Sequence, residues 1–260
     1  WAYEKCFSTH NKKVAQILLT RDDFSDRKRY INSRNTLIAL LSYGIIPVIN
    51  ENDTVATDEI KFGDNDHLSS LVASLIDAER FIILSDVDGL FTDNPRTHPS
   101  ATLIGFVGEI TPEIEKKAGG AGTLVGTGGM YSKVLAAKRA MQNGITVNII
   151  NGREKKAIHS LLKGIGLGTE FRGKKTKPSL RKSWIAHGSR AKGTLSLDAG
   201  AVRALIHGGK SLLPSGIVSL SGKFDAGDAV YCADTSGNRI AKGLTNYSSS
   251  EIEEIKGKKT

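Results

Sequence analysis

The chain has 260 residues, of which 39% are hydrophobic and 24% charged, so it is long enough for one large and one small packed domain. No apolar run approaches the roughly 18 residues that a membrane helix needs. Two cysteines are too few for a disulfide framework, so we expect a cytoplasmic protein with no membrane partner. The net charge of +9 is uneven, because residues 173–260 carry +8 and residues 1–172 only +1. A basic C-terminal third is typical of nucleic-acid binding and equally of a solvated surface.

The region up to residue 171 alternates short apolar runs with stretches of helical periodicity. Such alternation is typical of an α/β fold, and we expect a three-layer sandwich around a mainly parallel sheet. Pro47 lies inside one predicted strand and places it at a sheet edge or a bulge. In chain order we predict a strand at 14–19, a helix at 25–42, strands at 45–49, a helix at 66–76, a strand at 81–84, a helix at 130–143, a strand at 147–150 and a helix at 154–162.

The pattern of predicted elements changes after a basic segment. Residues 172–182 hold six basic residues, one proline and no acidic residue, which indicates an exposed linker. Beyond it come strands predicted at 183–186, 194–197, 216–219, 229–233 and 239–243, with one helix at 199–207. The prediction is therefore a first domain over 1–171, the linker over 172–182, and a small mostly-β domain over 183–260.

Polar side chains crowd two stretches, one just after a predicted strand and one at the start of a predicted helix. These are residues 50–53 (NEND) and residues 63–66 (GDND). Ligands of open parallel sheets bind at such positions. Carboxylates pair with the ammonium group of an amino acid, and amides donate to its carboxylates. Asn and Asp also favour turns and caps on their own account, so these residues by themselves leave both interpretations open.

A glycine-rich stretch, residues 126–133 (GTGGMYSK), leads into the helix predicted from residue 130. Glycines let backbone N–H groups approach phosphate oxygens, and the positive end of the helix favours an anion. Lys133 lies in the first helical turn, where it can neutralise charge on a transferring phosphoryl group. The spacing is neither that of a P-loop nor that of a Rossmann turn, so the stretch indicates only that a phosphate is held.

A third stretch, residues 85–96 (SDVDGLFTDNPR), follows a predicted buried strand. Asp86 therefore lies at the carboxyl edge of the sheet, where it can contact a nucleotide or orient a lysine. Residues 93–95 are typical of a turn.

Residues 85–96 resemble the strand, loop and hairpin that the amino acid kinase superfamily shares. The two polar stretches and residues 127–133 are more similar to one family within it, the glutamate 5-kinases. The region from about Trp184, including residues 212–217 (LLPSGI), resembles the PUA domain that many bacterial members append. The resemblance covers nearly the whole chain.

This resemblance implies ATP-dependent phosphorylation of the γ-carboxylate of L-glutamate to L-glutamyl 5-phosphate, the first step of proline biosynthesis, with ATP and Mg²⁺ as cofactors. It implies a homo-oligomer and proline as a feedback inhibitor. It assigns no metal ligand. Lys133 would stabilise the transition state, and Asp66 would hold catalytic lysines in position. Glutamate would contact Asp53, Asn65, Asp64 and Asn50, and ATP would contact Ser85, Asp86, Thr127, Gly128, Gly129, Met130, Tyr131, Ser132 and Lys133.

The sequence departs from the family pattern at both ends. The family begins with a glycine-rich turn that carries another phosphate-contacting lysine and continues with a substrate-binding serine, and neither has a counterpart before Trp1. The chain also stops earlier than the usual end of the PUA domain. We therefore expect a chain truncated at both ends, with little kinase activity by itself.

Two alternatives follow from the same residues. One is another amino acid kinase, acting on aspartate or acetylglutamate. The other is an RNA-binding protein, because PUA domains commonly bind structured RNA and the C-terminal third is basic. RNA binding is not favoured, because that third holds few aromatic side chains for base stacking.

Overall fold

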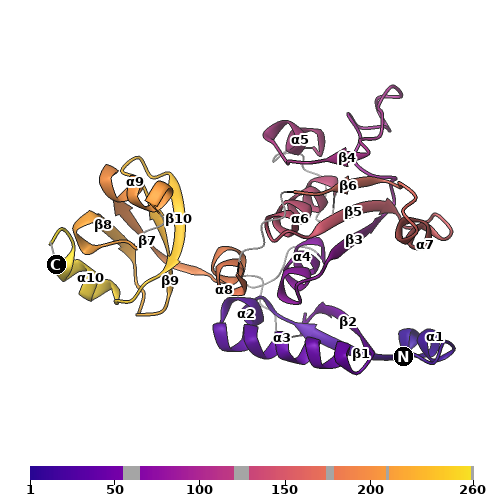
Figure 1. Cartoon of the computed structure of the whole chain (residues 1–260), viewed down its shortest axis with the longest axis horizontal. Helices are drawn as coiled ribbons and strands as arrows, with labels where there is room; N and C mark the ends of the chain where they lie inside the picture. The colour runs from indigo at the N-terminus through magenta and orange to yellow at the C-terminus, as the bar shows by residue number, and fades with distance from the viewer. Residues whose placement is uncertain (55–64, 120–128, 174–178, 209–210, 259–260) are drawn as a thin grey trace. The chain divides into compact units, whose positions relative to one another are not determined.

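The computed structural model describes residues 1–54, 65–119, 129–173, 179–208 and 211–258. The chain forms two compact units, Trp1–Leu180 and Arg181–Thr260 (Figure 1). Among the described residues, the first unit holds two sheets and the second holds one, and each unit has its own core. Within the described ranges, every helix is too short or too polar to cross a membrane.

The first unit alternates strands and helices along the chain, as the sequence predicts. Its elements are α1 (Ala2–Ser8), β1 (Lys13–Leu19), α2 (Arg21–Ser25), α3 (Arg27–Ser42), β2 (Ile45–Glu51), α4 (Asn65–Leu75), β3 (Arg80–Ser85), β4 (Phe106–Val107), α5 (Pro112–Lys117), α6 (Met130–Gln142), β5 (Thr146–Asn151), α7 (Ala157–Leu162) and β6 (Thr169–Phe171).

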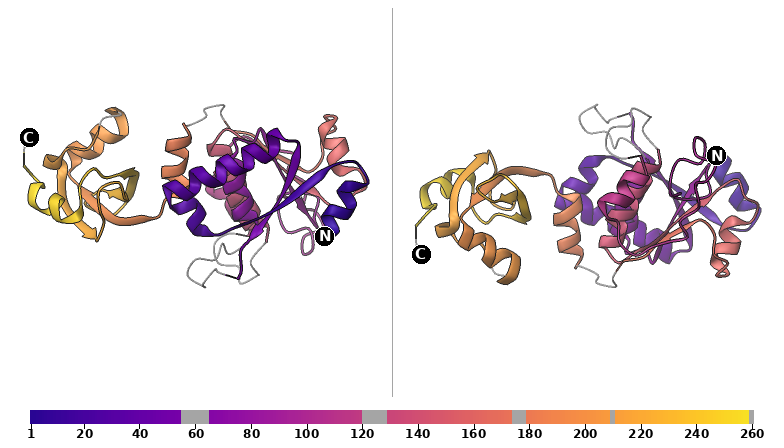
Figure 2. Two further views of the ribbon diagram at one scale, coloured as in Figure 1. Left: turned by 90° about the horizontal axis from the view of Figure 1, so that it is seen from below. Right: turned by 90° about the horizontal axis from the view of Figure 1, so that it is seen from above.

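Strand pairing in this unit is mainly parallel, which confirms the predicted class. β1 and β2 form a parallel pair, and Figure 2 shows α3 lying across it. The second sheet has the order β3-β5-β6-β4, in which β3 pairs parallel with β5, β4 parallel with β6, and β5 antiparallel with β6. Pro47 lies in β2, which has a partner on one side in the described structure, so its missing N–H is tolerated there.

The larger sheet lies between two helical layers. Val147 and Ile149 of β5 are fully buried against α4 and α6. Ile150 points to the opposite face, where it packs against Ala157 and Leu161 of α7. Because side chains alternate along a strand, the continuous apolar run of β5 serves both faces.

Two predicted helices have different bounds in the structure. The helix predicted over 25–42 is divided, because Asp26 has extended backbone angles and caps α3, accepting a hydrogen bond from the Arg29 N–H at 2.8 Å. The helix predicted from residue 154 begins at Ala157, because the preceding Lys156 has a left-handed conformation with φ of 65°.

The second unit is mostly β, with the sheet order β10-β9-β7-β8. Its core gathers the inward side chains of these strands, including Leu195, Leu197, Val230 and Cys232, around Phe224. Its elements are α8 (Leu180–Ser183), the π-helical turn η1 (Trp184–Gly188), β7 (Ala191–Leu197), α9 (Ala199–Gly208), the 3₁₀ turn η2 (Pro214–Gly216), β8 (Ile217–Gly222), β9 (Ala229–Ala233), β10 (Arg239–Leu244) and α10 (Ser249–Ile255).

The strand predicted at 183–186 is wrong. These residues lie at the end of α8 and in η1, where Trp184 is buried and its carbonyl accepts a hydrogen bond from the Ser189 N–H at 2.9 Å. The Ser189 hydroxyl closes the same turn by donating to the Ile185 carbonyl at 2.8 Å. An apolar run of four residues does not distinguish a strand from a helical turn.

Candidate functional site

Three side chains from two helices meet at Asp66. Lys133 Nζ lies 3.0 Å from Asp66 Oδ2, and Ser132 Oγ donates to the same oxygen at 2.7 Å. The Asp66 and Lys133 side chains are only 15% and 13% exposed, so their ion pair is screened less than a surface pair. The sequence places these residues 66 and 67 positions apart, and the fold brings them into direct contact.

The packing of α4 against α6 explains this contact. Ala73 of α4 and Ala136, Ala137 and Ala140 of α6 are buried in one cluster, and such small side chains allow two helices to approach closely. The first turns of α4 and α6 therefore lie together. These are the turns that the predicted substrate stretch and the glycine-rich stretch lead into.

The N-terminus of α6 has donors that can bind an anion. Its N-cap is Gly129, and among the described residues no side chain caps it. The first N–H groups of a helix have no partner within the helix, and the helix dipole favours negative charge there. Tyr131 is half-buried in the same turn. Thr127 and Gly128, which are predicted to contact phosphates, lie outside the described residues.

A second polar group lies at the carboxyl end of β3. Arg96 Nη2 donates to Asp86 Oδ2 at 3.4 Å, and Ser85 Oγ donates to Asp86 Oδ1 at 3.5 Å. On the neighbouring strand β5, Asn151 is in register with Ser85 and donates through Nδ2 to Asp88 Oδ1 at 2.9 Å. The carboxyl ends of two parallel strands thus present polar side chains at one edge of the sheet.

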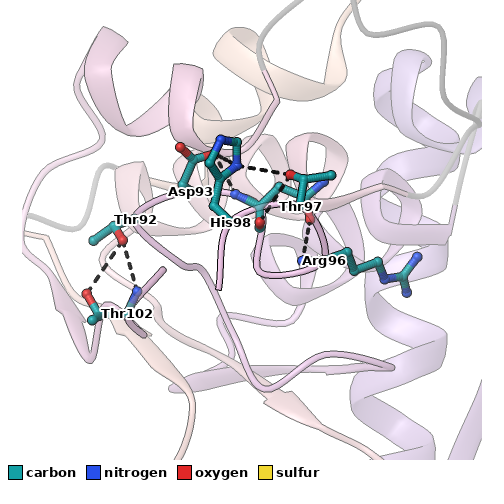
Figure 3. A network of polar contacts seen from close by, with 7 residues as sticks. Thr92, Asp93, Arg96, Thr97, His98 and Thr102 are labelled. Carbon is teal, nitrogen blue, oxygen red and sulfur yellow. Dashed lines mark hydrogen bonds and ion pairs between the residues drawn. The ribbon is translucent and has the colours of Figure 1, made fainter. Parts of the chain in front are cut away.

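A compact loop holds Arg96 in place. Figure 3 shows Thr92 bonded to Thr102 across the base of this loop, where the Thr102 N–H donates to Thr92 Oγ1 at 3.0 Å. At its tip His98 Nδ1 lies 3.3 Å from Asp93 Oδ1. The Arg96 side chain points away from this pair (Figure 3) and reaches Asp86.

The turn predicted at 93–95 is confirmed, because the Asn94 N–H donates to Asp93 Oδ1 at 2.7 Å and the Arg96 N–H donates to Asn94 Oδ1 at 3.0 Å. The pairing of Arg96 with Asp86 is a contact that we did not predict from the sequence. The available signal was that Arg96 is the one basic residue between 85 and 96.

The predicted glutamate contacts that the structure describes are all exposed. Asn50 is the exposed penultimate residue of β2, and Asp53 is exposed two residues after the end of that strand. Asn65 is the exposed first residue of α4. Over the ranges that the structure describes, no hydrogen bond or ion pair joins these three residues to one another or to Asp66. Asp64 lies outside the described residues. Their role in binding glutamate stays a prediction.

The chain matches known proteins over both units. The sequence pattern of the Amino acid kinase family matches residues 1–151, and that of the PUA domain matches residues 193–260. A glutamate 5-kinase from Caldanaerobacter subterraneus subsp. tengcongensis is 52% identical over 258 residues, which cover 99% of this chain and 69% of the relative. A glutamate 5-kinase from Citrifermentans bemidjiense is 51% identical over 256 residues, covering 98% of this chain and 69% of the relative.

Proposed function

Because the chain belongs to the amino acid kinase family, and within it to the glutamate 5-kinases, we propose that it transfers the γ-phosphoryl group of ATP to the side-chain carboxylate of L-glutamate. The product is L-glutamyl 5-phosphate, and the reaction opens proline biosynthesis. The observation that supports this most directly is the half-buried contact of Lys133 and Ser132 with Asp66 at the paired first turns of α4 and α6.

The chemistry of the transfer suits this arrangement. The acceptor carboxylate is already ionised at neutral pH, so no general base is needed. A bond forms between a carboxylate oxygen and the γ-phosphorus while the bond to the bridging oxygen breaks and ADP leaves. Catalysis is then mainly positioning and charge neutralisation. Lys133 supplies a positive charge whose place is fixed by Asp66, and the first N–H groups of α6 supply further donors.

ATP and Mg²⁺ fit the residues present. Among the described residues, no three His, Cys, Asp or Glu side chains gather closely enough to form a metal site. Mg²⁺ commonly binds through substrate phosphates with only one or two protein carboxylates, so a dedicated cage is not required. When bound, Mg²⁺ neutralises charge on the phosphates. Ser85 and Asp86 at the end of β3 are the proposed nucleotide contacts on the sheet.

The substrate assignment is tested by comparing acceptors. The protein is incubated with ATP, Mg²⁺ and L-glutamate, L-aspartate or N-acetyl-L-glutamate, and the acyl phosphate is trapped with hydroxylamine. We expect the hydroxamate to form with glutamate and not with the other two. Because the rates with the three acceptors are compared with one another, the experiment identifies the preferred acceptor even when turnover is slow. Turnover of aspartate or acetylglutamate without glutamate would replace the proposal with the corresponding kinase.

The role of Lys133 is tested with a matched lysine from the same helix. Lys138 also forms an ion pair, with Glu115 at 2.5 Å, but it lies more than one turn further along α6. We expect Lys133→Ala to lower kcat about 100-fold to 1,000-fold, because it removes a charge that stabilises the transition state. Lys138→Ala should change kcat by less than about threefold. Equal losses in the two variants would contradict the assignment.

The proposal also covers partners and location. A homo-oligomer is supported by Ile31, Ile38 and Leu41, which are exposed apolar side chains on α3. The cysteines Cys6 and Cys232 are both unpaired, which suits a reducing cytosol. Proline, as the end product, is proposed as a feedback inhibitor, and inhibition of hydroxamate formation by proline tests it.

A further inference from the structure

The hydroxyl group of Ser132 has two possible acceptors and one proton. Ser132 Oγ lies 2.7 Å from Asp66 Oδ2 and 2.8 Å from the Gly129 carbonyl oxygen. A carboxylate is the stronger acceptor, because hydrogen bonds to ionised groups are about twice as strong as neutral ones. The proton therefore belongs mainly to the bond with Asp66.

The second bond is one that many helical serines form. Ser42 in α3 donates in the same way to the carbonyl three residues earlier, Ala39, at 2.8 Å. A local bond of this kind accounts for the contact with Gly129. It does not account for the contact with Asp66, which comes from another helix and is 66 residues away in sequence.

The contact with Asp66 involves the oxygen that also holds Lys133. Lys133 Nζ is 3.0 Å from Asp66 Oδ2, so one carboxylate oxygen accepts hydrogen bonds from two adjacent residues of α6, Ser132 and Lys133. An isolated carboxylate can rotate about its side-chain torsions. A second donor on the same oxygen removes that freedom and fixes where the ammonium group lies. When the ammonium group turns toward a phosphate oxygen, the hydroxyl remains as a donor to Asp66.

We propose that Ser132 is a positioning residue, whose hydroxyl fixes Asp66 Oδ2 and through it the ammonium group of Lys133. This inference deepens the proposed phosphoryl transfer and rests on it. It gives the Ser132 side chain a task distinct from the predicted contact with ATP, because its hydroxyl donates to Asp66.

The physical contact is tested without any turnover. Urea unfolding is measured for the wild type, Ser132→Ala, Asp66→Ala and the double variant. Each substitution raises the unfolding equilibrium constant by some factor. If the two side chains interact, we expect the product of the two single factors to exceed the factor of the double variant about tenfold. Ser42→Ala combined with Asp66→Ala is the control and should be additive. Additivity for Ser132 and Asp66 would overturn the proposal, because the hydroxyl would then serve only Gly129.

The effect on Lys133 is tested by kinetics with glutamate and ATP. We expect Ser132→Ala to lower kcat about tenfold while the KM for ATP changes less than about threefold, and Ser132→Thr, which keeps the hydroxyl, to restore kcat. Ser42→Ala should leave both constants unchanged. Coupling without a loss of kcat, or no rescue by threonine, would overturn the positioning role. The wild type is measured first, with all three acceptors. A wild type that phosphorylates aspartate or acetylglutamate and not glutamate would instead overturn the proposed function, which separates the two failures.

Discussion

Two glycines with similar backbone conformations differ in what surrounds them. Gly164 has φ of +81° and Gly168 has φ of +67°, so both lie in the left-handed region that favours glycine. A Cβ atom on Gly168 would lie 2.0 Å from the Ile149 carbonyl oxygen and 2.8 Å from that of Asp88, whereas one on Gly164 would meet nothing within 4 Å. Gly168 lets β6 enter the sheet beside the polar edge formed by β3 and β5.

This difference predicts unequal costs for the same substitution. Gly164→Ala carries only the conformational penalty, about 1 kcal/mol in the free energy of unfolding. Gly168→Ala adds a clash with backbone atoms that cannot move aside, and we expect a loss of about 3 kcal/mol or more. Urea unfolding of both variants measures the difference. Equal losses would mean that the chain around Gly168 shifts freely.

At the scale of single residues, the sequence predicted which positions carry polar groups but not their partners. The glycine-rich stretch and the polar stretch pointed to Lys133 and Asp66 through their resemblance to a family. The bonds from Ser132 to Asp66 and from Arg96 to Asp86 depend on how helices and loops pack. That packing is decided by buried alanines and by a hairpin, so no local pattern reveals it.

At the scale of elements, α10 is a helix that we did not predict, although the signal for its start is present in the sequence. Ser248 and Glu251 form a capping box, in which the Glu251 N–H donates to Ser248 Oγ at 3.3 Å and the Ser248 N–H donates to Glu251 Oε2 at 2.7 Å. The serine, the glutamate three residues later and the apolar Ile252 are the sequence signature of this motif. Ile252 then buries the helix against the core of the second unit.

We expect Ser248→Ala to destabilise the second unit by about 1 kcal/mol, because it removes the side-chain acceptor for an N–H group at the start of the helix. Ser236→Ala is a matched control, since the Ser236 bond to Asp234 uses its backbone N–H and survives the substitution. Thermal unfolding followed by circular dichroism compares the two. A Ser248→Ala variant as stable as the control would show that packing of Ile252 holds α10 without its cap.

Long periodic elements were predictable and short ones were not. α4, β3, α6 and β5 follow clear apolar patterns, and their predicted bounds agree with the structure to within about two residues. β4 has two residues and β6 has three, so neither contains a full period of any pattern. Such strands exist because neighbouring strands supply their hydrogen bonds, and this information lies elsewhere in the chain.

At the scale of the whole molecule, the second unit has a core and a sheet of its own, so we expect residues 181–260 to fold when expressed alone. In this unit burial acts to raise the pKa of Asp228, but the N–H of Asp225 and the ammonium group of Lys192 outweigh it and lower the pKa below 3.8. A carboxylate with a lowered pKa stabilises the fold above its unfolded pKa, and this contribution is lost as pH falls through the folded pKa.

The isolated unit should therefore be less stable at pH 3 than at pH 7. Asp228→Asn should destabilise it at pH 7 by less than about 1 kcal/mol, because the pair with Lys192 is partly solvated, and should have a smaller effect at pH 3. Asp225→Asn is the control, because the bond from Asp225 to Asp228 uses the backbone N–H. Urea unfolding at both pH values tests this. An Asp228→Asn effect that is the same at both values would contradict the assigned cause.

The place of Asp66 has a consequence for how the two substrates would influence each other. This carboxylate belongs to α4, which follows the predicted glutamate stretch, and binds Ser132 and Lys133 of α6, which follows the glycine-rich stretch. A ligand that shifts the first turn of one helix must therefore alter the free energy of binding at the first turn of the other helix. Thermodynamic linkage is reciprocal, so we expect glutamate to change the affinity for ATP by the same factor as ATP changes the affinity for glutamate. Reciprocal coupling between donor and acceptor binding would be the outcome of sharing one carboxylate.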